Sequence, residues 1–432
     1  MDTNSQLNTG LTESLLQVNQ LSYKLPPQIS IASKCTHVIN YSQQASYNGG
    51  ETVIFDCQTG SQFVDPAASY LRLVVTPAAS THGFGSGSVN NIFSRVVVRT
   101  QTGAELSRCE DYNLLNKFME RYANSTSWFD SIGKAQGYSN NVGKAANKYC
   151  DAVPSTGKVF IVPVQCLMAC MNPIGAKLVP PNIMSGLRIE IQLANVNDAF
   201  CVVDQAVSPA VLASYTVKRP EMHWKVFELA DAFQRKIQEM AAQGLNYLYK
   251  ETFHTIVSTS TADINFDIKK AASKALTCRI ITRPAAPVDG KDKFSSAAYN
   301  YNTLQANIGA DYWPNQKLQI ETTPTLDNIN EAYYYTTYAV DKLEAWSPPS
   351  VTPNQFLGST PTGALTDDYS NGMICFNLNK SNVSELAGYT TSNSRALLIN
   401  LKQHSATSVR LDAYLTFLRL AKVMVSNTIV LD

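Results

Sequence analysis

Apolar and polar residues alternate in short runs along most of the chain, as they do in strands that bury one face. The clearest run spans 187–193, where Leu187, Ile189, Ile191 and Leu193 share one side. Comparable runs are THVINYS, ETVIFDC, YLRLVVTP, FSRVVVRT, AELSRCE, KVFIVPVQC and YTVKRPEMHWKVFEL, and later YLYKETFHTIVSTS, INFDIKK, LTCRIITRP, QKLQIETTP, MICFNLN, RALLINLK and VRLDAYLTFLRLAKVMV. Strands do not alternate with helices, so we predict an all-β chain rather than a doubly wound α/β fold.

The spacing changes once, between two β-rich halves. Apolar residues there recur at intervals of three and four, as on one face of a helix, and Gly244 is placed to end that helix. The stripe consists of Leu229, Phe233, Ile237, Met240 and Ala241. We predict a single helix that links two β domains.

Residues 1–30 form a polar segment that differs from both halves. Its apolar residues also have helix-like spacing, and they are Leu7, Leu11, Leu15 and Val18. We expect an arm rather than part of a core. The predicted division is an N-terminal arm over 1–30, a first domain over 31–228, a linking helix over 229–244 and a second domain over 245–432.

The two halves contain similar features in the same order, at an offset of about 210 residues. Segment 103–122 reads as a strand followed by a helix, and so does 315–338. The run at 158–164 then corresponds to 373–378, and the run at 187–193 corresponds to 397–401. Each half has room for about eight strands with long connections. Eight-stranded double-sheet jelly rolls fit this description, as do other β-sandwiches, so the pattern predicts two tandem β domains with a few short helices in loops.

Charge argues against a protein that binds nucleic acid strongly and directly. The formal net charge is +1 and no run of five to eight residues is rich in Lys or Arg. Charged residues make up only 16% of the chain, and 21 tyrosines accompany many Ser, Thr, Asn and Gln residues. This composition favours β-structure and extensive contact between proteins.

Cysteine use and the N-terminus indicate where the protein is made. The nine cysteines are odd in number and scattered, often inside apolar strands, as at Cys57, Cys278 and Cys375. We expect buried free thiols in a protein synthesised in a reducing compartment. The chain shows no signal peptide and no apolar stretch of membrane-spanning length.

A glycine-rich segment, GFGSGSVNNIFSRVVVR (83–99), is the strongest candidate for a phosphate-binding loop. It contains no Lys, position 88 is Ser rather than Gly, and a strand instead of a helix follows. We therefore interpret Gly83, Gly85 and Gly87 as a tight, positive-φ connection between strands.

No constellation for catalysis or metal binding is evident. The five histidines form no His-x-x-x-His pair, and the pairs Cys35/His37 and Cys166/Cys170 lack partners at zinc-site spacing. A Gly-x-Ser-x-Gly elbow is also missing. We predict that the protein is not an enzyme, and we assign no catalytic, cofactor-binding or metal-binding residue and no cofactor.

The segment Tyr70–Tyr122 carries a resemblance to a known family. It contains a strand YLRLVVTP, a small-residue turn, the hairpin SRVVVRT-QTG-AELSRCED and the run DYNLLNKF leading into a helix. This order resembles the double jelly-roll major capsid proteins of large nucleocytoplasmic DNA viruses. The loop GFGSGSVNNIF is most similar to the polinton-like virus and virophage side of that lineage.

The resemblance implies two tandem eight-stranded jelly rolls, a double jelly roll joined by a helix. It also implies a structural virion protein, which is synthesised in the host cell cytoplasm and located in the virion capsid. In this family three chains form a trimer, a pseudo-hexagonal (pseudo-hexameric) capsomer, and these tile an icosahedral capsid around a double-stranded DNA genome. The implied partners are two further copies in a homotrimer, neighbouring capsomers, and penton and minor capsid proteins. Residues 1–30 are expected on the inner side, where they contact neighbours or an internal membrane.

Two alternatives remain open at this point. The chain could be a minor capsid or penton component, although such proteins usually carry one jelly roll. It could also be a carbohydrate-binding β-sandwich protein with an aromatic cleft at Tyr333–Tyr335. In either capsid reading, the polar stretches 284–316 and 346–372 are expected to be loops that build the outward-facing top of the capsomer and part of the trimer contact.

Overall fold

A computed structural model gives the fold of the chain. It describes residues 32–138, 150–175, 177–203, 210–230, 234–235, 239, 242, 244–287, 289–290, 292–294, 301–320, 326–340, 349–357, 371–379, 388–392, 395–423 and 429–431. The predicted arm over 1–30 lies outside the described residues.

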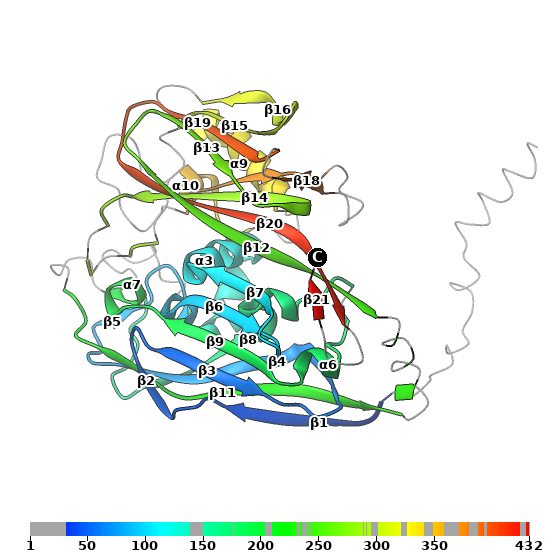
Figure 1. Cartoon of the computed structure of the whole chain (residues 1–432). Helices are drawn as coiled ribbons and strands as arrows, with labels where there is room; N and C mark the ends of the chain where they lie inside the picture. Colours follow the sequence, from blue (N-terminus) through cyan, green and yellow to red (C-terminus); the bar gives the residue numbers. More distant parts are fainter. Residues whose placement is uncertain are drawn as a thin grey trace, which may run out of the picture.

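The first half forms two facing antiparallel sheets (Figure 1). One sheet has the order β1 (Ala32–Tyr41), β11 (Tyr215–Leu229), β4 (Phe63–Pro77) and β8 (Lys158–Pro163), with β2 (Ser46–Asn48) also paired to β11. The other has the order β3 (Thr52–Cys57), β9 (Leu187–Leu193), β6 (Phe93–Arg99) and β7 (Glu105–Glu110). The predicted alternation in β9 is confirmed, because its apolar residues are buried and the intervening ones are not.

The second half repeats this arrangement strand for strand. One sheet has the order β12 (Leu245–Thr259), β20 (Val409–Val423), β14 (Ala272–Pro284) and β17 (Met373–Asn377). The other has the order β13 (Asp263–Ile268), β19 (Leu397–Gln403), β15 (Tyr301–Ile308) and β16 (Asp311–Gln319). In both halves one sheet takes the first, eighth, third and sixth of these eight strands, and the other takes the second, seventh, fourth and fifth. Each half is therefore an eight-stranded jelly roll.

Short strands and helices complete the two rolls. Strands β5 (His82–Gly83) and β10 (Cys201–Val202) pair with each other, β18 (Tyr389–Thr391) pairs with β14, and β21 (Ile429–Leu431) pairs with β20. The short helical turns are α4 (Thr126–Asp130), α5 (Val164–Leu167), α6 (Pro181–Met184), α7 (Val196–Ala199), α10 (Pro353–Leu357), η1 (Val89–Ile92), η2 (Ile132–Gln136) and η3 (Ala169–Met171).

The three paired features of the predicted repeat occupy equivalent places in the two rolls. Strand β7 leads into α3 (Tyr112–Ala123), as β16 leads into α9 (Leu326–Ala339). Strands β8 and β17 hold the same place in their sheets, and so do β9 and β19. The repeat seen in the sequence is thus a repeat of structure.

The boundary of the predicted linking helix needs one correction. Leu229 is the last residue of β11, where it pairs with Ala32 of β1, so the helical stripe does not begin at Leu229. Of residues 231–243 the structure describes four, and all four are helical: Gln234, Arg235, Glu239 and Ala242. The other residues of the predicted stripe over 231–243 lie outside the described part.

The two stretches expected to be outer loops contain core residues. Residues 301–308 of the stretch 284–316 form β15, a strand paired on both sides, in which polar residues alternate with buried apolar ones. In 346–372, the side chains of Val351 and Phe356 are buried in the second core. These parts of the loop prediction are wrong, because polar composition alone does not distinguish a loop from a strand; residues 295–300 and 358–370 lie outside the described part.

The hydrophobic cores of the two rolls are interlocked. Leu114, Phe118 and Tyr122 come from α3, a helix of the first roll, yet their side chains belong to the second core. In the other direction, the first core receives side chains from the ends of two second-roll strands, Tyr247, Tyr249, Ala421 and Val423. Each roll therefore depends on the other to bury its apolar surface.

Phe118→Ala tests this interlock. The Phe118 side chain is fully buried in the second core, so we expect truncation to destabilise the protein by about 3 to 5 kcal/mol. Denaturant unfolding should still show one transition, because α3 joins both cores. Val211→Ala, at an exposed position, is the control, with an expected change within about 0.5 kcal/mol. Equal effects of the two substitutions would contradict the interlock, as would two separate transitions in which Phe118→Ala shifts only one.

Candidate functional site

The junction between the rolls brings several buried polar and charged side chains together. The sheet β3-β9-β6-β7 and α3 of the first roll lie next to the sheet β12-β20-β14-β17 of the second (Figure 1). The first-roll side is formed by the predicted hairpin, which turns at Gln101–Gly103, and by the helix that follows it. The turn is confirmed: Arg99 pairs with Glu105, and Gly103 has a φ of 85°, which favours glycine.

Side chains of one roll satisfy backbone groups of the other across this junction. The hydroxyls of Tyr247 and Tyr122 donate to the carbonyls of Cys170 and Asn371, at 2.6 and 2.9 Å. The Leu106 carbonyl accepts from Tyr249 Oη and from Arg419 Nη1, the latter at 3.0 Å. Because buried polar groups are costly without partners, these bonds fix how the two rolls meet.

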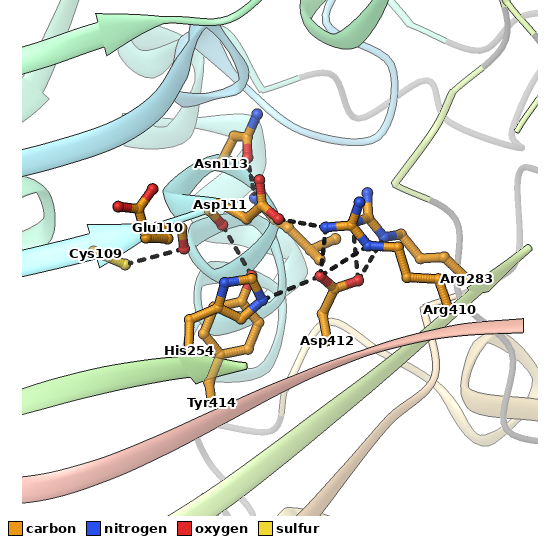
Figure 2. Close-up of polar contacts among 10 residues, drawn as sticks. Cys109, Glu110, Asp111, Asn113, His254, Arg283, Arg410, Asp412 and Tyr414 are labelled. Atoms are coloured by element: carbon orange, nitrogen blue, oxygen red, sulfur yellow. Dashed lines mark hydrogen bonds and ion pairs between the residues drawn. The ribbon is translucent and has the colours of Figure 1, made fainter. Parts of the chain in front are cut away.

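A cluster of charged and aromatic residues lies at the start of α3 (Figure 2). Asp111 precedes the helix in a left-handed conformation, with φ 44° and ψ 45°. Its carbonyl accepts a hydrogen bond from Tyr414 Oη at 3.0 Å, and its carboxylate pairs with Arg410. The strained residue of the first roll is thus held by two side chains of β20.

Asp412 is the centre of this cluster. Its side chain is fully buried and lies 2.8 Å from Arg283 Nη2, 2.9 Å from Arg410 Nη2 and 3.1 Å from His254 Nε2. The His254 ring also stacks on Tyr414, with centroids 4.4 Å apart. Burial disfavours the charge of Asp412, but the hydrogen bond from His254 and the charges of Arg283 and Arg410 outweigh it and lower its pKa to about 2.

The donor atoms of Asp111, His254 and Asp412 lie within 4.8 Å of one another, which is close enough for a metal site. However, Arg410 pairs with both carboxylates and Arg283 with one of them. The two negative charges are therefore already balanced, and a cation would have to displace a guanidinium. We interpret the group as an ion-pair cluster that joins the rolls. Sequence reasoning did not single it out, because its residues come from three distant segments.

Glu251 is a second buried carboxyl at the junction. Its Oε1 accepts from Ser107 Oγ at 3.3 Å and from two backbone N–H groups, those of Arg108 and Thr252. Arg419 is 3.9 Å away. Burial dominates over these contacts and raises the pKa of Glu251 to about 7, so this carboxyl titrates near neutral pH.

The glycine-rich segment binds a carboxylate of the second half. Ser86 N donates to Asp292 Oδ2 at 2.8 Å, and Ser86 Oγ bonds to the same oxygen. Gly85 has a φ of 62°, and a Cβ there would lie 2.9 Å from Asp292 Cγ. The interpretation as a tight connection holds at Gly85, whose positive φ lets the backbone approach an internal acidic side chain. It does not hold in full for the other two glycines: neither has a positive φ, Gly83 belongs to β5, and the short helix η1 precedes β6.

The other residues singled out in the sequence do not form a site among the described residues. None of the nine cysteines, all of which the structure describes, forms a disulfide, and the expected burial of Cys57, Cys278 and Cys375 is confirmed. Cys166 is exposed, whereas burial raises the pKa of the Cys170 thiol and makes it a poor metal ligand. No described helix is long and apolar enough to span a membrane.

The aromatic run considered as a carbohydrate cleft does not form one. Tyr333 and Tyr335 are partly buried against the second core, with Tyr333 Oη donating to the Val351 carbonyl at 2.8 Å. Only Tyr334 of the three is exposed, at 61%.

Two tandem jelly rolls of this topology define the double jelly-roll class of fold. The chain is similar to the PBCV-1 capsid in its quasi-atomic model (12% identity, 95% of this chain and 98% of that chain, TM-score 0.60). It is also similar to the Faustovirus major capsid protein, with 8% identity over 94% of each chain and a TM-score of 0.56. A third similar structure is the mavirus major capsid protein, with 10% identity over 95% of this chain and 92% of that chain and a TM-score of 0.53. No family model and no curated protein sequence matches the chain. At these identities the likeness establishes the fold.

Asp412→Asn tests the ion-pair cluster. Removing the charge leaves two guanidiniums at the junction without their central partner, so we expect a loss of roughly 3 kcal/mol at pH 7. Because the folded pKa is depressed, the stabilisation is complete above about pH 4 and is lost as the pH falls toward 2. The difference between the free energies of unfolding of wild type and variant, measured with denaturant, should therefore be about 1 kcal/mol smaller at pH 3 than at pH 7. A difference that does not change with pH would contradict the depressed pKa of Asp412.

Glu251→Gln should have the opposite pH signature. A carboxyl whose folded pKa is raised destabilises the fold as the pH rises from about 4.5 through 7, because the unfolded chain loses its proton first. Gln keeps the acceptor oxygen without the charge. We expect a gain of roughly 2 to 3 kcal/mol at pH 8 and little change at pH 4.5, measured by thermal unfolding in matched buffers. A variant that is less stable than wild type at pH 8 would contradict the buried-charge explanation.

Proposed function

We propose that the protein is a major capsid protein, a non-enzymatic structural component of an icosahedral virion, and that it works as a homotrimer. The fold and its likeness to solved major capsid proteins support the capsid role. Trimer formation is inferred from the way in which the two rolls pack on each other within one chain. The second sheet and α3 of roll one contact the first sheet of roll two, so the interface joins unlike faces.

When two rolls pack through unlike faces, each roll keeps one face that the other roll does not cover. The sheet β1-β11-β4-β8 of the first roll has no described element packed on its outer side, at the bottom of Figure 1. This sheet is the counterpart of the one that α3 covers in the second roll. Large apolar side chains are exposed on its two outermost strands: Ile39, Tyr41, Val159 and Ile161.

The open sheet carries the same combination of side chains as the covered one. Tyr70 stacks on His223 with centroids 4.7 Å apart, and Glu221 bonds His223 at 3.3 Å and Arg72 at 3.2 Å. In the second roll a His–Tyr stack likewise adjoins an acid–Arg pair, and Asp111 covers it. The similarity of the two clusters supports the view that a residue of a neighbouring subunit covers the first-roll cluster, as Asp111 covers the second-roll cluster.

The matching face on the second roll is supplied by α9. Its counterpart α3 is buried on nearly all sides because it lies between two rolls. Helix α9 instead exposes Tyr334 (61%) and Tyr338 (38%), which are one helical turn apart. Exposed tyrosines at this spacing are typical of an interface.

The two open faces fit a second copy of the chain. We infer that α9 of one subunit packs on the outer β1-β11-β4-β8 sheet of the next, which repeats between chains the junction seen within one chain. An interface of unlike faces closes into a ring when the rotation permits. Three chains then place six similar rolls in one ring, which is a pseudo-hexagonal capsomer.

The proposed domain bounds, shell assembly and partners are those expected from the sequence. The domains are an arm over 1–30, rolls over 31–228 and 245–432, and a link between them. The capsomers tile a shell around a double-stranded DNA genome, with penton and minor capsid proteins as partners and the arm in contact with neighbours or an internal membrane. The lineage that the sequence resembles, that of polinton-like viruses and virophages, supports these roles.

The double variant Tyr334→Ser/Tyr338→Ser tests the trimer. Both side chains are exposed in one chain, so the fold should persist, while each interface should lose about 2 kcal/mol or more per buried tyrosine. We expect wild type at about three times 47.4 kDa in solution and the variant as a monomer, by light scattering after size exclusion.

Leu398→Ser is the matched control. Leu398 is 42% exposed on β19, and its counterpart in the first roll, Arg188 of β9, keeps 44% of its side chain exposed. The control should remain trimeric. A monomeric wild type would overturn the proposed function, and a trimeric tyrosine variant would overturn the assigned interface.

A further inference from the structure

A groove with a cavity of about 590 Å³ lies at the junction, along the face of α3 that holds its partly exposed residues. One wall is a stripe of α3, in which Leu115, Met119 and Ala123 are spaced by four residues. Trp128 and Ile132 extend this apolar wall. The opposite wall is the outer side of the second-roll sheet, with Lys250, Thr252, Arg279 and Thr416. The volume falls in the range of roughly 300 to 1,000 Å³ typical of small-ligand sites.

Arg279 is the unusual residue of this groove. It is only 9% exposed, and its Nη1 donates to Thr416 Oγ1 at 2.6 Å. Its Nε is buried and has no hydrogen-bond partner in the described part of the chain. No described carboxylate lies within ion-pair distance of its guanidinium, unlike Arg283 and Arg410 on the same sheet.

The two buried carboxyls nearby are engaged elsewhere. Glu120 lines the same groove, but its carboxylate accepts from Asn124 Nδ2, and no ion pair joins it to Arg279. Burial raises the pKa of Glu120, which disfavours its charged form. Glu251 faces Ser107 and Arg419. The positive charge of Arg279 is therefore left unbalanced in a buried site, which is costly unless a ligand supplies the counter-charge.

We propose that this groove binds a small amphipathic carboxylate, a monocarboxylic acid with an apolar tail. The carboxylate pairs with the Arg279 guanidinium, which lines the groove and has no described carboxylate partner. The tail lies along Leu115, Met119 and Ala123. The single buried cation, Arg279, matches the single negative charge of a carboxylate. A phosphate group carries more negative charge, and the other cation of the groove, Lys250, is exposed at the rim rather than buried beside Arg279.

Dodecanoate is a suitable probe, and dodecanol is its uncharged counterpart. We expect dodecanoate to bind the full chain with one site per subunit by calorimetry and to raise the melting temperature, whereas dodecanol should bind at least tenfold more weakly. Arg279→Gln should weaken dodecanoate binding by about tenfold or more, because it removes the charged partner. Arg279→Lys should retain part of the affinity.

Arg188→Gln is the control for loss of a surface charge, since Arg188 is 44% exposed on β9, away from the groove. It should bind dodecanoate like wild type. Met119→Trp keeps Arg279 but places a larger side chain in the groove, so it should also weaken dodecanoate binding. This variant tests the proposal if Arg279→Gln fails to fold.

The proposal is overturned if dodecanoate does not bind, if Arg279→Gln binds it as tightly as the control, or if dodecanol binds equally well. It is also overturned if Met119→Trp leaves the affinity unchanged, or if an acidic peptide binds at Arg279 and dodecanoate does not. None of these readouts depends on trimer formation, so the groove and the capsid role can fail separately.

Discussion

The structure depends on the burial of α3 between two sheets that belong to different rolls. The helix follows β7 in the first roll, yet Leu114, Phe118 and Tyr122 complete the second core. A jelly roll alone would expose this apolar surface. The first core likewise needs Tyr247 and Tyr249 from the start of β12. Because each core lacks side chains that only the other roll provides, the two rolls form one folding unit.

This burial also explains the opposed behaviour of two carboxyls at the junction. Both Asp412 and Glu251 are removed from water, which disfavours their charged forms. Asp412 has two guanidiniums and a histidine in direct contact, so its charge is strongly favoured. Glu251 has one guanidinium at 3.9 Å, and its other contacts are too few to offset burial. The number of close cations, rather than depth in the protein, decides the protonation state of each.

The sequence was sufficient for the features that depend on local pattern. Alternation in segments such as 187–193 gave the strands, and the order of three paired features revealed the repeat. It was insufficient wherever polar residues are buried. Strand β15 contains Asn, Thr and Gln, so it reads as a loop, and its burial depends on pairing with β16 and β19. The cluster of Asp111, His254 and Asp412 exists only because three distant segments meet at the junction, and no spacing in the sequence encodes that meeting.

The glycine-rich loop and Arg279 follow from the same rule of charge balance. The loop at Gly85 and Ser86 has the small residues and free backbone N–H groups of an anion site, and Asp292 of the other half supplies the anion. Arg283 and Arg410 have Asp412. Arg279 is also buried but has no described carboxylate, and it lies beside a cavity with an apolar wall. The guanidiniums of Arg283 and Arg410 are balanced by Asp412, whereas that of Arg279 has no described carboxylate and lies next to empty volume, which a ligand from outside the chain would explain.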